Sequence, residues 1–227
     1  MTSVAERLGV VNGRLAQAVA KAGRPPGDVK LVAVSKTKPA SAIREAYAAG
    51  QRAFGESYAQ ELAEKSLALG DLPDLEWHFI GHLQSNKAKL IARAAEMVHT
   101  VDSEGLAREL AKRVAQAGRP RLPVLIEVNV GGEAQKFGVS PGELAEVIAA
   151  VAEEAPLLLA GLMTVPPLGD SATARKIFSA LASLRNLHGG AAALPELSMG
   201  MSADMEEAVA CGATIVRVGS AIFGPRE

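Results

Sequence analysis

A lysine directly after an apolar run is the first residue of this sequence that could do chemistry. Lys36 follows the segment LVAVS, and lysines are almost never fully buried unless they are paired or functional. Partial desolvation lowers the pKa of such an amine, and the neutral amine can attack a carbonyl to form a Schiff base. The alternative is a surface lysine that extends its amine into water, as Lys38 would do two residues later.

Two segments near the C-terminus contain glycine and serine in an arrangement that could bind phosphate. LSMGMS holds Ser198 and Ser202, and VRVGS holds Gly219 and Ser220. Each segment ends an apolar run just before a possible helix start, where backbone N–H groups bind anions. Two alternatives remain, because Ser202 could be only a helix N-cap and Gly219–Ser220 only a tight turn.

An arginine lies inside the apolar run TIVRVG. Arg217 needs a partner there, since an unpaired buried guanidinium is very costly. Glu127 and Asp204 are candidate structural partners, and a bound ligand is the other possibility. A lysine, a phosphate site and an inward arginine together would suit an aldehyde that carries a phosphate ester.

The elements that must position these residues follow a regular rhythm. Short runs rich in β-branched residues alternate with segments of helical period, and the runs are apolar throughout, as in parallel strands covered on both faces. The predicted strands are Leu31–Ser35, Ala53–Gly55, Trp77–Gly81, Met97–Val101, Val124–Val130, Gly161–Val165, Glu196–Met199 and Thr214–Val218. Between the fifth and sixth, SPGELAEVIAAVAEE predicts a helix that opens with a capping box of Ser140 and Glu143.

Eight strand–helix units predict a (β/α)8 barrel. The apolar spacing of Leu8, Val11, Leu15 and Val19 adds an extra helix before the first strand, and a doubly wound open sheet is the competing interpretation. We expect the whole chain, residues 1–227, to form a single domain. In a barrel, the carboxyl ends of the strands carry the functional residues, so Lys36 and the two glycine–serine segments should meet at one mouth.

Composition excludes several classes of function. The chain has 24 Lys+Arg and 25 Asp+Glu, which is not the basic surface of a nucleic-acid-binding protein. One cysteine rules out an internal disulfide framework, and no run is apolar and long enough to span a membrane. These two features lead us to expect a cytoplasmic protein. His78 and His82 lack a partner at metal-ligand spacing, so we expect no metal site.

Seven motifs make the sequence similar to a known family. LVAVSKTKP, AFGES, WHFIGHLQSNKAK, VLIEVNVGGEAQKFGV, GLMTVPP, LSMGMSADMEEAVACGAT and VRVGSAIFG occur in the order typical of pyridoxal phosphate homeostasis proteins, which are also described as alanine-racemase-like. The resemblance runs from about Val4 to Pro225. It implies a (β/α)8 barrel that holds pyridoxal 5′-phosphate (PLP) as a Schiff base, with no established catalytic reaction.

The resemblance also implies roles for individual residues. Lys36 resembles the Schiff-base lysine, and Arg217 resembles the arginine that faces the pyridine nitrogen. The positions that resemble those flanking the ring and binding the phosphate are Ser198, Ser202, Gly219 and Ser220. Ser57 in FGES departs from the usual FGEN, and we expect no ligand contact there.

Three functions follow as hypotheses. The first is a monomeric carrier that buffers PLP and passes it to PLP-dependent apo-enzymes by transient contact. The second is an amino-acid racemase, whose second base could only be Tyr47 or Tyr58. The third is an aldolase-like enzyme with Glu56 or Asp102 as acid or base. A guanidinium cannot accept a proton from the ring nitrogen and disfavours carbanion chemistry, which favours the carrier or a racemase-like reaction over transamination.

Overall fold

Eight parallel strands close into a barrel in chain order in the computed structural model, which describes residues 2–167 and 170–225. β1 pairs with β8 from Lys30↔Ile215 to Ala33↔Val218, which closes the sheet. This confirms the predicted (β/α)8 barrel and excludes the open sheet. The strands are β1 Lys30–Val34, β2 Ala53–Glu56, β3 Glu76–Phe79, β4 Met97–Val101, β5 Leu122–Glu127, β6 Leu157–Met163, β7 Glu196–Ser198 and β8 Ile215–Val218.

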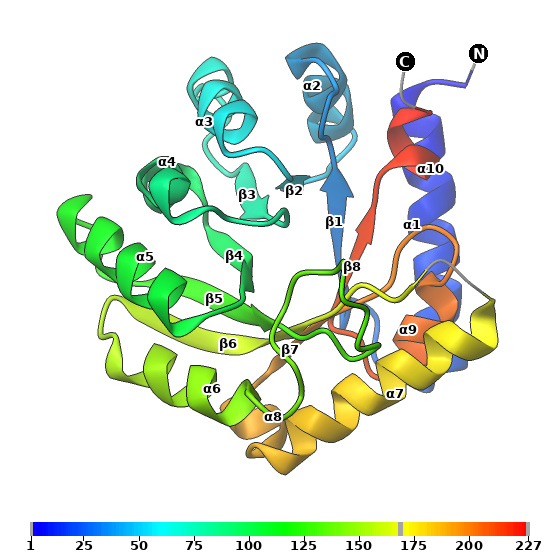
Figure 1. Cartoon of the computed structure of the whole chain (residues 1–227). Helices are drawn as coiled ribbons and strands as arrows, with labels where there is room; N and C mark the ends of the chain where they lie inside the picture. The colour runs from blue at the N-terminus through cyan, green and yellow to red at the C-terminus, as the bar shows by residue number, and fades with distance from the viewer. Residues whose placement is uncertain (1, 168–169, 226–227) are drawn as a thin grey trace.

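Helices surround the strands (Figure 1). The predicted extra helix is α1, which precedes the first strand. Its capping box of Ser3 and Glu6 fixes its start. The helices are α1 Val4–Lys21, α2 Ala40–Ala48, α3 Ala59–Ala68, the short 3-10 helix η1 Ser85–Lys87, α4 Ala88–Ala94, α5 Glu104–Gln116, α6 Leu144–Glu153, α7 Ser171–Leu187, α8 Gly190–Ala193, α9 Met205–Ala210 and α10 Ser220–Phe223.

Two strand boundaries differ from the sequence prediction by three residues or more, and the others agree within two residues. β5 ends at Glu127 instead of Val130, because Val128 pairs only in an isolated bridge with Val139. β6 begins at Leu157, four residues before the predicted start at Gly161. Gly161 is therefore interior to the strand, next to a register shift, and a Cβ there would lie 1.9 Å from the carbonyl oxygen of Glu196. A glycine inside a strand commonly marks such a close approach.

The predicted start of the helix after β5 was wrong. α6 begins at Leu144, beyond the expected capping box. The Ser140 hydroxyl donates to the Glu143 carboxylate at 2.7 Å, and the Ser140 N–H donates to the same oxygen at 3.0 Å. The hydroxyl is thus used on the side chain of Glu143 instead of capping a backbone N–H, and residues 141–143 form a turn.

Side chains of the strands alternate between the barrel wall and its lumen. In β1, Leu31 and Ala33 belong to the large core between strands and helices, whereas Val32 belongs to a separate apolar cluster. That smaller cluster also contains Ala53, Leu125, Ala160, Met163 and Ile215. The rest of the buried interior includes polar side chains such as His78, His99, Ser198 and Arg217. The lumen is therefore only partly filled by apolar groups.

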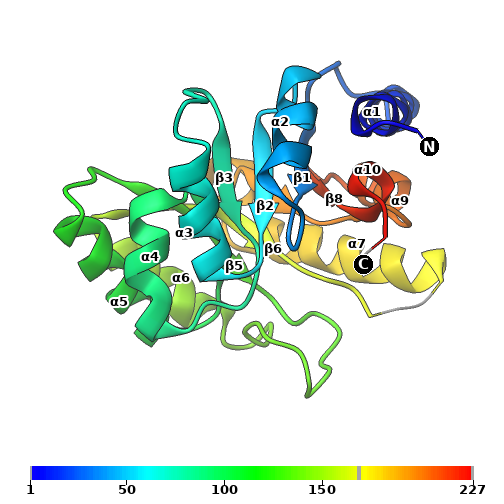
Figure 2. The ribbon, with the colours of Figure 1, turned by 90° about the horizontal axis from the view of Figure 1, so that it is seen from above.

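Helix α1 ties down the segments that follow β7 and β8. Figures 1 and 2 both show α1, in dark blue, beside α10, in red. The Arg7 Nε donates to the Ile222 carbonyl at 2.6 Å. The Arg14 guanidinium donates to the Ser202 carbonyl at 3.2 Å and pairs with Glu206 at 2.8 Å. The helix outside the eightfold repeat thus positions the two predicted phosphate-binding segments.

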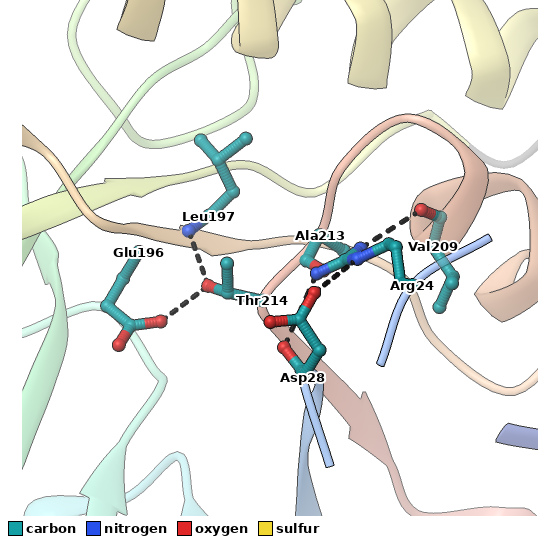
Figure 3. Close-up of polar contacts among 7 residues, drawn as sticks. All are labelled: Arg24, Asp28, Glu196, Leu197, Val209, Ala213 and Thr214. Carbon is teal, nitrogen blue, oxygen red and sulfur yellow. Dashed lines mark hydrogen bonds and ion pairs between the residues drawn. The ribbon is translucent and has the colours of Figure 1, made fainter. Parts of the chain in front are cut away.

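The opposite end of the barrel is held by the loop between α1 and β1. Arg24 donates to the carbonyl groups of Val209 and Ala213, at 3.2 and 2.7 Å, and pairs with Asp28 at 2.7 Å (Figure 3). These bonds join the start of β1 to the segment that leads into β8. Within the described part of the chain, no helix is both long and apolar enough to cross a membrane.

Val10 and Val11 are neighbours on α1 with opposite surroundings, 65% and 2% exposed. We expect Val11→Ala to lower the free energy of unfolding by about 2 kcal/mol, because it removes buried methyl groups. Val10→Ala is the matched control and should change it by less than about 0.5 kcal/mol. Urea unfolding measures both values, and equal effects would contradict the packing of α1.

Candidate functional site

Five of the six predicted site residues line one cavity of about 390 Å³. The cavity lies where β1 and β8 end, as expected for the mouth of a barrel. The five residues are Lys36, Ser202, Arg217, Gly219 and Ser220. Closure of the sheet thus brings together residues from three parts of the sequence: a lysine, an arginine, two serines and the glycine of a turn.

Ser198 is the predicted residue that does not line this cavity. Its side chain is fully buried at the end of β7. Its hydroxyl oxygen accepts a hydrogen bond from Arg217 Nη1 at 2.5 Å and lies 2.8 Å from His99 Nδ1. Ser198 therefore contacts the guanidinium that faces the cavity. Neither this role nor the involvement of His99 was predicted from the sequence.

Arg217 is 4% exposed and has two hydrogen-bond partners, the Ser198 hydroxyl and the Thr164 carbonyl at 3.0 Å. Burial lowers the pKa of Arg217 to about 10, against the opposing effect of the charges of Glu127 and Asp204. The side chain is still a cation at neutral pH. The two carboxylates proposed from the sequence as partners thus act at a distance, while neutral oxygens make the direct contacts.

The turn after β8 approaches β1 closely. A Cβ at Gly219 would lie 3.2 Å from the Val34 carbonyl oxygen and 3.3 Å from the Val34 Cβ, so this position favours glycine. The close approach brings Ser220, the first residue of α10, to the end of β1. On the β7 side, α9 begins at Met205 with Asp204 as its N-cap, so Ser202 lies in the preceding turn and is not the N-cap.

The backbone is strained directly after Lys36. Thr37 has φ +64° and is the only non-glycine residue with positive φ among the residues described. A β-branched residue there is an outlier, and such strain costs on the order of 1–3 kcal/mol. The Thr37 N–H donates to Glu61 Oε1 at 2.7 Å. The carboxylate of α3 thus holds the turn that carries Lys36.

A buried ion pair between Lys65 and Glu56 supports the same turn. The Lys65 ammonium donates to Glu56 and Glu61, each at 2.7 Å, and to the Ser35 carbonyl at 2.8 Å. The Ser35 hydroxyl donates to the same Glu56 oxygen at 2.7 Å. Burial raises the pKa of Glu56, while the bonds from Lys65 and Ser35 oppose this shift.

This arrangement uses Glu56 for structure. Its carboxylate is fully buried and bonded to Lys65, so it is not placed as the acid or base that an aldolase-like enzyme would need. The role of Lys65 was not predicted from the sequence. The signal was available, since Lys65 lies three residues after Leu62 on the buried face of α3, and a buried lysine requires a partner.

Acidic and aromatic residues surround the far side of the mouth. Burial, reinforced by the nearby charge of Asp102, raises the pKa of Glu127 to about 7. Asp102 lies 3.2 Å from His82 Nδ1, and the His82 ring stacks on Phe137 with centroids 3.7 Å apart. Among the described residues, no group of three or more His, Cys, Asp or Glu side chains could hold a metal ion.

Ser57 lines the cavity with Lys36, although its sequence context led us to expect no ligand contact there. The same two residues also line a neighbouring cavity of about 500 Å³, which is bordered by Tyr58 and Lys87. Lys36 is thus reachable from two adjoining cavities. The Lys38 ammonium donates to the Pro225 carbonyl at 2.6 Å, so it anchors the end of the described chain beside the mouth.

Comparison with known proteins places the chain in a family. The family model described as alanine racemase, N-terminal domain, matches residues 11–227. The chain is also 47% identical to the pyridoxal phosphate homeostasis protein of Pseudomonas aeruginosa, over 100% of this chain and 97% of that protein. The chain belongs to the pyridoxal phosphate homeostasis protein family. This confirms the resemblance found in the seven sequence motifs.

Solved structures agree with this membership. PipY of Synechococcus elongatus PCC7942, solved with PLP bound, is 40% identical with a TM-score of 0.79, over 92% of this chain and 100% of PipY. An unknown protein from Bifidobacterium adolescentis is 35% identical with a TM-score of 0.90, over 97% and 94% of the two chains. The barrel architecture is therefore shared with both proteins along almost the whole chain.

Removal of the Lys65 ammonium should destabilise the fold, because it leaves the buried Glu56 without its partner. We expect Lys65→Met to lower the free energy of unfolding by about 3–5 kcal/mol, because Glu56 then remains buried without its partner. Lys112 is exposed on α5, so Lys112→Met is the matched control and should have an effect of less than about 0.5 kcal/mol. Similar values for both variants in urea unfolding would contradict the role of Lys65.

Glu127 should make stability depend on pH. Its pKa is raised from 4.5 to about 7, so the folded state binds the extra proton between these values and wild-type stability falls as pH rises through this window. Glu127→Gln removes this loss. We expect the variant to be more stable than wild type by about 1–3 kcal/mol at pH 8, with the difference vanishing near pH 4.5. Urea unfolding from pH 4.5 to 8 tests this, and a constant difference would refute it.

Proposed function

We propose that this chain binds PLP in the 390 Å³ cavity, holds it reversibly on Lys36, and supplies or buffers it without catalytic turnover. The observation that carries the proposal is the convergence of the Lys36 side chain and the buried Arg217 guanidinium in one cavity with a glycine–serine turn. The cavity volume lies within the range of ordinary small-molecule sites. PLP is also the ligand named for PipY.

The residues of the cavity fit the three parts of PLP. Ser202, Gly219 and Ser220 supply hydroxyl groups and a close backbone turn for the phosphate. Arg217 is a buried cation that would donate to the ring nitrogen. Lys36 would provide the amine. When bound, the group supplies an aldehyde that condenses with a primary amine, releasing water, in a reaction that water reverses.

Arg217 favours storage over carbanion chemistry. A guanidinium has donors and no acceptor, so it stabilises a ring nitrogen that carries a lone pair and disfavours a protonated one. An unprotonated ring is a weak electron sink. The bonds from Arg217 to Ser198 and Thr164 fix this donor orientation. The same reasoning argues against transamination.

The racemase alternative needs a second base beside the cofactor. Tyr58 borders the neighbouring cavity and is 56% exposed. Tyr47 donates to Asp74, and its ring lies under Arg52 at 4.1 Å, so it is used elsewhere. A general base must be held within hydrogen-bond reach of its proton, and an exposed Tyr58 does not provide such a position.

The proposed role also includes where the protein acts and which proteins receive PLP from it. The carrier would act as a monomer in the cytoplasm and transfer PLP to PLP-dependent apo-enzymes by transient contact. The assignment of residues 1–227 to one PLP-binding domain is part of the same proposal. The family name of the Pseudomonas aeruginosa relative supports a role in homeostasis.

The first test is covalent labelling. Purified protein is incubated with PLP, reduced with borohydride and digested, and the modified peptide is identified by mass spectrometry. We expect the label on Lys36 and its reduction to background in Lys36→Ala. Lys38→Ala is the control and should retain the label. A protein that takes up no PLP, or a label on another lysine in wild type, would refute the proposal.

The carrier and the racemase are separated by a second measurement on the PLP-loaded protein. Exchange of the Cα proton of alanine in D₂O, followed by NMR, reports any racemase-like step. We expect no exchange above that of free PLP. Exchange that is lost in Tyr58→Phe would establish the enzyme in place of the carrier.

A further inference from the structure

A row of buried polar side chains crosses the barrel from the cavity. It begins at Arg217 on β8, whose Nη1 donates to Ser198 on β7 at 2.5 Å. The Ser198 hydroxyl lies 2.8 Å from His99 Nδ1 on β4, and His99 Nε2 lies 2.8 Å from His78 Nδ1 on β3. All four side chains are at most 4% exposed. Each gap is one hydrogen bond, so the row is continuous.

The row ends at the opposite mouth. His78 Nε2 lies 3.6 Å from the Glu76 carboxylate, which accepts a hydrogen bond from Lys30 at 2.8 Å. Both charged residues are at the beginning of their strands and are partly exposed. Glu196, which accepts a hydrogen bond from the Thr214 hydroxyl there (Figure 3), adds a further negative charge. The row thus connects the cavity with solvent at the other end of the barrel.

The neutral form is favoured for both imidazole rings. Burial lowers the pKa of His78 and lowers that of His99 well below its usual value. The cations Lys30 and Arg217 act in the same direction on His99. A neutral imidazole has one N–H donor and one lone-pair acceptor, so the position of a single proton on each ring decides the direction of every bond in the row.

The two ends of the row determine that direction. The Glu76 carboxylate accepts from Lys30 at 2.8 Å and lies 3.6 Å from His78 Nε2, and its interactions with these two groups lower its pKa to about 2. An ionised carboxylate is only an acceptor, so it favours the tautomer of His78 that carries its proton on Nε2. His78 Nδ1 then accepts from His99 Nε2–H, and His99 Nδ1 accepts from the Ser198 hydroxyl. The Ser198 lone pair is left to receive Arg217. In this arrangement each hydrogen bond between His78 and Arg217 joins one donor to one acceptor.

The reverse direction fails at both ends. A proton on His99 Nδ1 would make the Ser198 oxygen accept from both His99 and Arg217, and the row would contain no acceptor for the hydroxyl proton. His78 would then present its Nε2 lone pair to the Glu76 carboxylate. An unsatisfied buried donor costs about 1–3 kcal/mol, so the first direction is the stable one.

We propose that His99 and His78 are positioning residues that fix the Ser198 hydroxyl so that it accepts from Arg217 and holds the guanidinium toward the cavity. The inference rests on the proposed function only for what Arg217 then contacts, namely the ring nitrogen of PLP. The orientation of Arg217 itself belongs to the protein without ligand. It can therefore be measured independently of PLP.

The first test uses NMR of the ligand-free protein. We expect ¹⁵N shifts at pH 7 to show both His78 and His99 as neutral rings protonated at Nε2. Arg217 should give separate, slowly exchanging Nη signals, because Ser198 and Thr164 hold its two ends. A charged ring, or either ring protonated at Nδ1, would overturn the proposal whether or not the protein binds PLP.

The second test compares two substitutions of His99. His99→Asn keeps an acceptor near the position of Nδ1, whereas His99→Leu removes it. We expect His99→Leu to lose the separate Arg217 signals, to retain PLP about tenfold less tightly and to shift the visible absorption of the PLP-loaded protein. His99→Asn should restore all three. His78→Leu and His78→Asn form a second matched pair for the next position in the row.

The outcomes separate the two proposals. If the wild-type protein shows the expected tautomers but does not bind PLP, the proposed function is refuted and the positioning role of the two histidines still holds. Equal Arg217 signals and absorption in His99→Leu and wild type would overturn the positioning role. Where His99→Leu does not fold, as judged by thermal unfolding, the wild-type tautomers and the His99→Asn spectra decide.

Discussion

The burial of one permanently charged side chain organises the inside of this barrel. Arg217 lies in a lumen that apolar residues would otherwise fill, and a buried cation must be surrounded by acceptors. Ser198 and Thr164 provide the direct contacts, from β7 and from the end of β6. The histidines of β3 and β4 extend this requirement across the lumen. The polar half of the interior is therefore a consequence of placing a guanidinium at the floor of the cavity.

The other end of the cavity depends on a different device. Lys36 is not held by its own strand alone, because Thr37 adopts a strained conformation that Glu61 fixes and Lys65 supports. The turn that carries Lys36 and the Arg217 guanidinium are thus held by separate networks, one on α3 and one in the lumen. Changes in one network should leave the other in place, which is why the ligand-free orientation of Arg217 is a property separate from the chemistry of Lys36.

Sequence periodicity was sufficient for the barrel and for the place of most site residues. The strand ends gave the positions of Lys36, Gly219 and Ser220 because parallel strands share one carboxyl edge. The interior contacts could not be predicted in the same way. Arg217 signals that it needs a partner, but the choice of Ser198 over Glu127 or Asp204 depends on which strands face each other across the lumen. The predicted start of α6 was wrong for a local reason, since the Ser140 hydroxyl could either accept from a backbone N–H as an N-cap or donate to the Glu143 carboxylate, and it donates.

The contacts of α1 restrict the order in which the elements of the barrel can fold. Its Arg7 meets Ile222, 215 residues away, and its Arg14 meets Ser202. The polar groups of α1 are therefore satisfied only after β8 and α10 are in place, and contacts of such large sequence separation form late. The cavity between β1 and β8 does not exist until this step. Occupancy of the site would consequently report that the barrel has closed.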